Sequence, residues 1–448
     1  MKPREQQQPD VEDMFRSRLE NIINQRHELV LLAKAIDWQR FDEVFEPLFC
    51  DVGSPGLPTR LMVGLQILKY MHGLSDPEVT AQWIQNPYFQ YFCGEVYFQH
   101  KAPFDRSSMT RWRQRIGDEK LAILVQESLA SAQRTGALSP KDVRRVTVDT
   151  TVQPKNITFP TDAKLLYTSI VRLNRLARRH GVKLRQSYLR VGKLALIKSQ
   201  RYAHAKQFRR QRREIKFLHV RLGRVIRDIE RKTEHDPILR AAFESELNLA
   251  KRIRAQKKRQ AGPKVYSCHA PETECIGKGK AHKPYEFGVK VSITTTNARA
   301  KGGMFILHAK ALHGNPYDGH TLSEVVDELT DWVGARPERI YVDKGYRGHK
   351  LKAPLSVFRS GQKRGVTPQI KRELRRRAAV EPIIGHTKAE HRMDRNYLKG
   401  REGDRTNAVL AAAGYNFKQI ANWLKAILCA WIIRSLWGRD QRLLHDPA

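Results

Sequence analysis

The sequence has no long apolar segment of the kind that crosses a membrane. Residues 1–13 are polar, and the most apolar stretch, residues 420–437, is interrupted by Lys425 and Arg434. We therefore expect a packed amphipathic helix there and no membrane partner. Cysteine is scarce, with 5 residues and no close pairing spacing, which fits the reducing cytoplasm better than a disulfide framework. A glycine loop followed by Lys and Ser or Thr is also missing, so nothing supports an ATP-driven motor.

Acidic residues are too few to balance the basic ones. The chain of 448 residues holds 82 Lys and Arg against 46 Asp and Glu, a net charge of +36. Residues 164–260 alone hold 29 Lys and Arg against 7 Asp and Glu, so 29 − 7 = +22 of the excess lies there. Such a charge predicts a polyanionic partner, and charge alone leaves nucleic acid, an anionic lipid surface and heparin-like polymers open.

The same basic segment shows helical periodicity. Leucine and isoleucine recur at helical spacing, as at Leu166, Ile170 and Leu173, which predicts long helices with one basic face rather than disorder. A contact with DNA is the interpretation that the charge density favours. The alternative is a solvated helical hairpin with a purely structural role.

The first 135 residues have the pattern of an all-helical domain. Ser75 and Glu78 fit a capping box around Asp76-Pro77, and Gly117 stands where a helix from about Ser108 would stop. The motif at 105–115 places hydroxyls at the start of that helix and cations along it, which suits contacts with phosphates and base edges. The candidate DNA-binding residues are Arg106, Ser107, Ser108, Thr110, Arg111 and Arg113. An ordinary basic surface helix is the alternative.

The hydrophobic period changes to that of strands at residues 144–152, and further strands are predicted at 285–296, 304–312 and 339–343. A helix is expected at about 320–333. These elements predict an α/β core over residues 140–400, into which the basic helices of 164–262 are inserted. Amphipathic helices are expected over 401–448.

Two aspartates have positions suited to chemistry. Asp149 lies inside the first predicted strand, and Asp343 ends a later one just before Gly345. Carboxylates near a sheet core are costly without a counter-charge, and a carboxylate at a strand end is well placed to hold a cation. The pair needs a third acidic ligand, for which Glu381 is the natural candidate.

Glu381 has cations on the same helical face. Arg377 lies four residues before it and Lys388 seven after, and Pro382 puts the glutamate at a helix terminus or bend. Mg²⁺ takes hard oxygen ligands, so two ions can share three carboxylates and one phosphate of the substrate. We therefore expect catalytic and metal-binding roles for Asp149, Asp343 and Glu381, and DNA contacts for Arg377 and Lys388.

The candidate acids lie in three sequence motifs: VDTTVQPKNITFPTD at 148–162, YVDKGYRG at 341–348 and EPIIGHTK at 381–388. They resemble the DDE transposases of bacterial insertion sequences, in the insertion-sequence-five-like group. The stretches LPTRLMVGLQILKY at 57–70 and SDPEV at 75–79 also resemble the helical domain that precedes the catalytic domain in that group. The resemblance covers most of the chain, although the insertion at 164–262 is larger than in the simplest members.

The resemblance implies a ribonuclease H-like catalytic core, with Asp149 on its first strand, Asp343 after its fourth and Glu381 on a late helix. It further implies Mg²⁺, with Mn²⁺ as a substitute, and DNA as partner, both the inverted repeats at the transposon ends and the target. A homodimer assembled on DNA and a nucleoid-associated cytoplasmic location are expected. A catalytically silent DNA-binding regulator and a structure-specific nuclease derived from a transposase remain alternatives.

A second cluster of possible metal ligands lies near the end of the insertion. Cys268, His269, Cys275 and His282 offer soft ligands, but they lack the two-residue cysteine knuckle of a zinc finger. A basic, glycine-bearing loop that leads into the next strand is the preferred interpretation.

Overall fold

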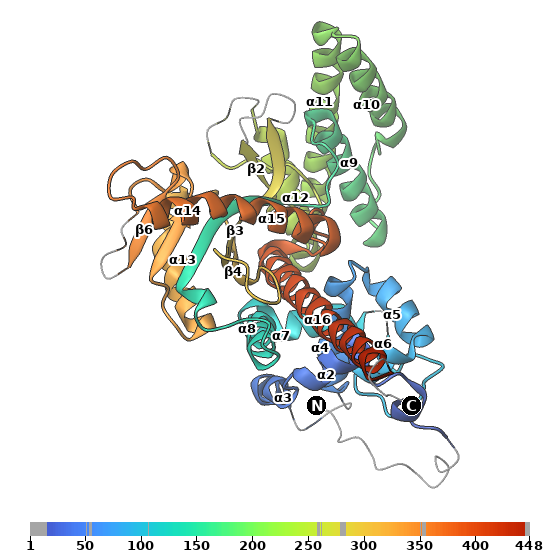
Figure 1. Ribbon diagram of the computed structural model, residues 1–448. Helices are drawn as coiled ribbons and strands as arrows, with labels where there is room; N and C mark the ends of the chain where they lie inside the picture. The colour runs from blue at the N-terminus through green and yellow to red at the C-terminus, as the bar shows by residue number, and fades with distance from the viewer. Residues whose placement is uncertain are drawn as a thin grey trace. The chain divides into compact units, whose positions relative to one another are not determined.

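The computed structural model describes residues 16–443 except 51, 53–55, 106, 258–259, 261, 278–283, 350 and 352–354, with side chains described up to residue 430 except that of Asp118. The chain forms two compact units. The first comprises Met1–Pro154 and Lys290–Ala448, and the second comprises Lys155–Val289. Figure 1 follows the chain from its blue N-terminal helices to the red C-terminal helix.

The N-terminal part of the first unit is helical, as the sequence predicted. Its α-helices are α1 (Leu19–Ile22), α2 (Glu28–Ala35), α3 (Gln39–Phe45), α4 (Thr59–Met71), α5 (Asp76–Gln85), α6 (Pro87–Phe92), α7 (Ser108–Leu121) and α8 (Ile123–Arg134). Short 3-10 turns η2 (Glu46–Leu48) and η3 (Asp142–Arg144) accompany them. The capping box is confirmed, because Ser75 caps α5 and exchanges hydrogen bonds with Glu78. Gly117 breaks α7 internally with φ 74°, a conformation that favours glycine.

The sheet of the first unit carries the candidate acids. Its described strands are β1 (Arg145–Pro154), β3 (Tyr285–Thr296, of which 290 onward belongs to this unit), β4 (Ile306–Leu312), β5 (Arg339–Val342) and β6 (Ser356–Arg359). They follow the order β4-β3-β1-β5-β6, in which β1, β5 and β6 run parallel and β3 pairs antiparallel with β4. The four predicted strands are confirmed, whereas β6 was not predicted.

Helices of the same unit follow and cover these strands. They are α13 (Asp318–Val333), α14 (Pro368–Arg376) and α15 (Val380–Glu390), with 3-10 turns η4 (Lys344–Tyr346) and η5 (Arg377–Ala379). α13 packs against β4, and α15 packs against β1. The helix predicted at 320–333 is therefore α13, which begins two residues earlier.

The C-terminal helix α16 (Gly400–Leu443) joins the N-terminal helices to the sheet. It packs against α2, α4, α8 and β4. Asn416 accepts a hydrogen bond from the Ile306 amide (2.9 Å) and donates one to the Ser128 hydroxyl (2.9 Å). The packed part is the first half, in which residues 406–417 are buried, whereas the described residues from 422 to 430 are mostly exposed. In the described part of the chain, no helix has the length and apolarity that spanning a membrane requires.

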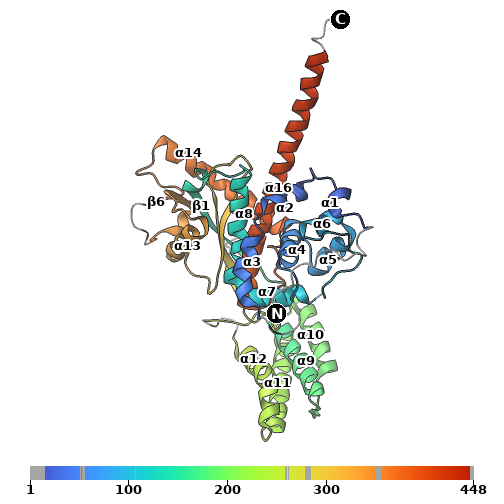
Figure 2. The same cartoon turned by 90° about the horizontal axis from the view of Figure 1, so that it is seen from below.

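The second unit is the basic helical insertion. Its helices are α9 (Asp162–Arg179), α10 (Leu189–His204), α11 (Phe208–Thr233) and α12 (Pro237–Ala255), and its strand β2 (Glu274–Gly277) pairs antiparallel with residues 285–288. The four helices lie side by side (Figure 2). Their apolar faces form one core, with Leu173, Leu222 and Phe243 fully buried, which confirms the predicted amphipathic helices.

Candidate active site

Parallel pairing of β1 and β5 brings Asp149 and Asp343 together. Arg145, Val146 and Thr147 pair with Arg339, Ile340 and Tyr341. Two residues further along, this register sets Asp149 beside Asp343, and both lie on the same face because side chains alternate along a strand. Asp343 directly follows β5 and accepts a hydrogen bond from the Gly345 amide (2.7 Å).

The environment of Asp149 disfavours its ionised form. Burial raises the pKa of Asp149 to about 6, and the neighbouring carboxylates of Asp343 and Asp318 act in the same direction. The Thr150 amide, which donates to Asp149 Oδ1 at 2.8 Å, and Arg377, at 3.4 Å from Oδ2, lower the pKa and offset part of this rise. The site therefore concentrates negative charge at a partly buried place, which a cation would stabilise.

Asp318, a third carboxylate at this place, was missed by the sequence analysis. It begins α13 and accepts hydrogen bonds from the Thr150 hydroxyl (3.3 Å) and from Lys290 Nζ (3.1 Å). A Cβ at Gly345 would lie 3.0 Å from Asp343 Oδ1 and 3.3 Å from Asp318 Oδ2, so both carboxylates border the space that this glycine leaves open. The only signal in the sequence was an acid in the first turn of a helix that follows a strand.

Arg377 is brought to the aspartate pair by the helical segment α14-η5-α15. Its anchor is Glu373, which is buried and bound by the Tyr341 hydroxyl and by Arg145 (3.0 Å) on the same face of the sheet. One helical turn later, Arg377 forms its ion pair with Asp149. The predicted proximity of this arginine to the candidate active site is therefore seen, although its partner is Asp149.

Glu381 lies one further turn along the same segment, in the first turn of α15, and its side chain is exposed. Lys388 lies in the last turn of that helix. Among the described residues, no group of three His, Cys, Asp or Glu side chains is arranged to hold a metal ion. The structure thus brings Asp149 and Asp343 together, and the place of Glu381 as a third ligand stays a prediction.

The donor set nevertheless suits a hard divalent cation. Asp149 and Asp343 supply carboxylate oxygens, which Mg²⁺ prefers, and their mutual repulsion would be relieved by a bound cation. Gly345 leaves space beside them. Tyr346, which is buried, lies close enough for all three aspartates to raise the pKa of its phenol, after burial as the main cause. The carboxylates therefore converge on one place.

The candidate DNA-binding helix α7 requires one correction. Ser107, Thr110 and Arg111 are exposed and Ser108 is half-buried, so these four remain candidates. Arg113 is 5% exposed and donates to Asp76 Oδ2 (2.6 Å) and to Gln66 Oε1 (3.2 Å), so it cannot reach DNA. Arg106 lies outside the described residues.

Arg113 belongs instead to a buried ion-pair network. Lys69 also binds Asp76, at 2.7 Å. Burial alone would favour the neutral carboxyl of Asp76, but the hydrogen bonds and charges of Arg113 and Lys69 lower its pKa to about 2. The network holds α4, α5 and α7 together.

Comparison with known proteins now identifies the class. Residues 17–115 match the family model described as a transposase domain (DUF772), and residues 250–417 match the one described as a transposase DDE domain. A relative from Rhizobium meliloti, described as uncharacterized protein ORF8 in the nfe locus, is 52% identical over 196 residues, which are 44% of this chain and 95% of that protein. No solved structure matches.

The two family matches define a transposase. The chain belongs to the insertion-sequence DDE transposases, proteins that bind DNA and act in the transposition of mobile elements. Asp343 and Glu381 lie within the matched DDE domain, whereas Asp149 and most of the insertion lie outside it.

Proposed function

We propose that this protein cuts DNA at the ends of its mobile element and joins them to target DNA, with Asp149, Asp343 and Glu381 as the catalytic, metal-binding acids. The observation that carries the proposal is the side-by-side placement of Asp149 and Asp343 at the matching level of two parallel strands. The order β4-β3-β1-β5-β6, with β1 central, supports a ribonuclease H-like core. Membership of the insertion-sequence-five-like group rests on the three sequence motifs.

The same site would serve both reactions. Water attacks the phosphorus at a transposon end and releases a 3′ hydroxyl, which then attacks a target phosphodiester and displaces a new 3′ hydroxyl. Mg²⁺, or Mn²⁺ in its place, held by the three acids, would activate the attacking oxygen and stabilise the leaving oxygen. Arg377 orients Asp149 through their ion pair, and Lys388 is proposed to contact the DNA backbone.

The remaining assignments follow the division of the chain. Residues 1–135 would recognise the inverted repeats through Ser107, Ser108, Thr110 and Arg111, residues 140–400 would hold the catalytic core, and residues 401–448 would form the C-terminal helical part. Two protomers would pair on DNA, because two ends must be brought together.

The test is cleavage and joining of end-containing DNA in Mg²⁺ by the full chain and by Asp149→Asn, Asp343→Asn and Glu381→Gln. Each substitution removes a charge and keeps the shape, so both steps should be lost while DNA binding persists. Glu390→Gln is the matched control, because Glu390 is an exposed acid at the other end of α15. Full cleavage by any of the three variants would contradict its assignment.

The alternatives give different outcomes in the same assay. A wild-type chain that cuts but never joins is a nuclease. One that binds the ends without cutting them is a regulator.

A further inference from the structure

α11 presents a row of cations on its solvent side, interrupted at Val220. Positions 209, 213, 216, 220, 224, 227 and 231 recur every three or four residues, so they share one face of a helix with 3.6 residues per turn. They are occupied by Arg209, Arg213, Lys216, Val220, Arg224, Arg227 and Arg231, and no acid stands among them. We call these six cations the α11 row.

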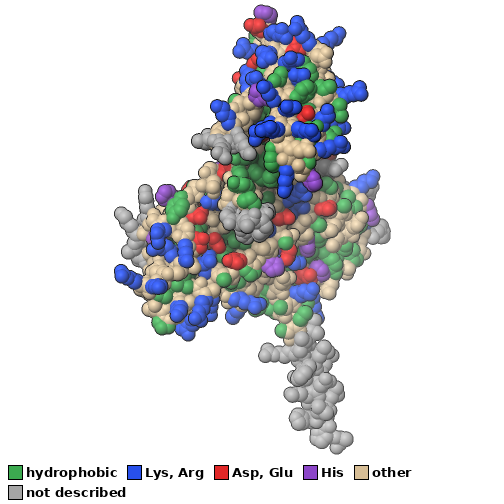
Figure 3. All heavy atoms as spheres, turned by 90° about the horizontal axis from the view of Figure 1, so that it is seen from above, with side chains coloured by type: hydrophobic (Ala, Val, Ile, Leu, Met, Phe, Trp, Pro, Cys, Tyr) green, Lys and Arg blue, Asp and Glu red, His purple; other side chains and the backbone are tan. Residues whose placement is uncertain are grey.

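The row faces away from the core of its unit. Leu218, Leu222 and Ile229 of the same helix are fully buried, and they lie on the opposite side of α11. All six cations are exposed, and in Figure 3 Lys and Arg side chains gather over the helices of this unit, in the upper part of the view. Packing of the insertion therefore fixes which face of α11 meets solvent.

The charges of the row are largely unused within the protein. Arg209, Arg213, Lys216, Arg224 and Arg227 have no side-chain hydrogen bond or ion pair to another described residue, whereas Arg231 is paired with Asp228 (3.3 Å). Like charges repel at this spacing, so the row costs stability unless an anion neutralises it. A row of this kind is unexpected in a merely structural hairpin.

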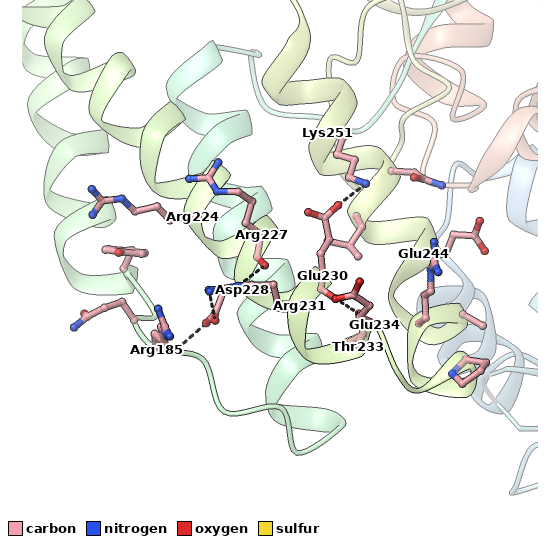
Figure 4. A pocket seen from close by; sticks show the side chains of 17 residues that line it. Arg185, Arg224, Arg227, Asp228, Glu230, Arg231, Thr233, Glu234, Glu244 and Lys251 are labelled. Carbon is pink, nitrogen blue, oxygen red and sulfur yellow. Dashed lines mark hydrogen bonds and ion pairs between the residues drawn. The ribbon is translucent and has the colours of Figure 1, made fainter.

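The second half of the row borders a hollow of about 1010 Å³ between α11, α12 and the segment before α10. Figure 4 shows Arg224 and Arg227 on α11 at the edge of the hollow, with Arg185 below them in the view. Four acids also line the hollow, Asp228, Glu230, Glu234 and Glu244; of these, Asp228 is paired with Arg231 and Glu230 with Lys251. The hollow thus adds concave shape to the row, and its lining holds three further cations, Arg185, Arg240 and Lys251, beside these acids.

We propose that the α11 row binds the phosphate backbone of duplex DNA. From Arg209 to Arg231 the row extends over 22 residues, or about 33 Å, which is about one turn of duplex DNA. Cations spaced by one helical turn meet closely spaced phosphates, and neutralising them releases condensed counterions. The site would read no base sequence, because contacts with phosphates position the protein on DNA but carry no sequence information. The choice of DNA rests on the proposed function.

The experiment measures the salt dependence of binding to duplex DNA of random sequence. The full chain carries Asp343→Asn, so that the DNA is not consumed. The row variant adds Lys216→Gln, Arg224→Gln and Arg227→Gln. The matched control adds Arg175→Gln, Arg178→Gln and Arg179→Gln, which remove the same charge from exposed positions of α9 in the same unit.

The row variant should lower the slope of log affinity against log salt by about 2 to 3, at about 0.9 per phosphate contact. Between about 50 and 200 mM salt, the fold loss of affinity should therefore be about 40 times smaller for the row variant than for the parent. The control should keep the parental slope. Equal slopes for the parent and the row variant, or equal flattening in both variants, would overturn the proposal.

A variant that adds a cation to the row predicts the opposite change in salt slope, so that a misfolded row variant could not by itself decide the test. Val220 occupies the gap in the row and is half-buried, so Val220→Lys should steepen the slope by about one unit. An unchanged or flatter slope counts against the row.

Two further measurements test the choice of DNA over RNA and distinguish a failure of the row proposal from a failure of the proposed function. A row-dependent preference for duplex RNA over duplex DNA would overturn the choice of DNA. Cleavage of end-containing DNA by a chain with intact acids is measured in parallel. If that chain cuts DNA but the row variant leaves the salt slope unchanged, only the proposal for the α11 row is refuted. If the row variant flattens the salt slope but the chain with intact acids does not cut DNA, only the proposed function is refuted.

Discussion

Asp149→Asn should change how the stability of the protein depends on pH. The folded protein raises the pKa of Asp149 from 3.8 to about 6, mainly through burial and then through Asp343 and Asp318. For a carboxyl with a raised pKa, the folded state favours the neutral form. Its contribution to stability is therefore full below the unfolded pKa and is lost as pH rises through about 6. Asparagine does not ionise, so the variant escapes this loss.

The magnitude follows from the shift. A rise from 3.8 to about 6 is about 2 pKa units, and at about 1.4 kcal/mol per unit the ionised carboxylate costs about 3 kcal/mol at neutral pH. The side chain is 17% exposed, so screening by solvent removes little of this cost. Relative to wild type, the free energy of unfolding of Asp149→Asn should therefore rise by about 3 kcal/mol between about pH 4 and pH 8.

The assay is urea unfolding of both proteins at these two pH values in the presence of a chelator. Asp331→Asn, which changes an exposed acid near the end of α13, is the matched control and should show no such pH dependence. If the stability difference between Asp149→Asn and wild type is the same at both pH values, the electrostatic account of the site is wrong. Added Mg²⁺ should stabilise wild type at pH 8 more than the variant, because binding to the folded state alone adds stability.

Three more substitutions test other parts of the structure. Asp318→Asn should lower cleavage about 10- to 100-fold with little effect on DNA affinity, because Asp318 supports the catalytic pair; unchanged turnover would reject that role. Arg113→Ala should destabilise the folded protein by about 3 kcal/mol by breaking a buried ion pair, measured by urea unfolding, and a loss of DNA affinity without destabilisation would restore the original DNA-binding hypothesis. Leu222→Ala should cost about 2–5 kcal/mol in the helical insertion, detected as earlier loss of helix on heating.

The strands and helices were predictable because their patterns are local. Val146 and Val148 are fully buried in β1, and the run of β-branched residues around them marked the strand. The capping box at Ser75 likewise involves residues three apart. β6 has no fully buried residue and only four positions, so its pattern was too short to separate it from a loop.

The buried position of Arg113 could not be predicted from the local sequence pattern. Met109, Trp112 and Ile116 of α7 are buried, and Arg113 lies on their side of the helix. The sequence contained that spacing, but a charged residue on an apolar face makes sense only when its partner is known. The partner, Asp76, is 37 residues away and is brought near by tertiary packing. Asp318 escaped notice for the same reason, because its proximity to Asp149 depends on the packing of α13.

Strand register determines whether the candidate active site exists at all. A slip of one residue between β1 and β5 would turn Asp149 to the opposite face of the sheet, away from Asp343. Glu373 opposes such a slip, since it binds Arg145 of one strand and Tyr341 of the other. The insertion that follows β1 leaves this register intact, because lengthening a connection adds closure entropy only slowly. The acids can therefore stay in place while the inserted helices change in length and charge, and a DNA-binding face on α11 could be gained or lost without rebuilding the catalytic pair.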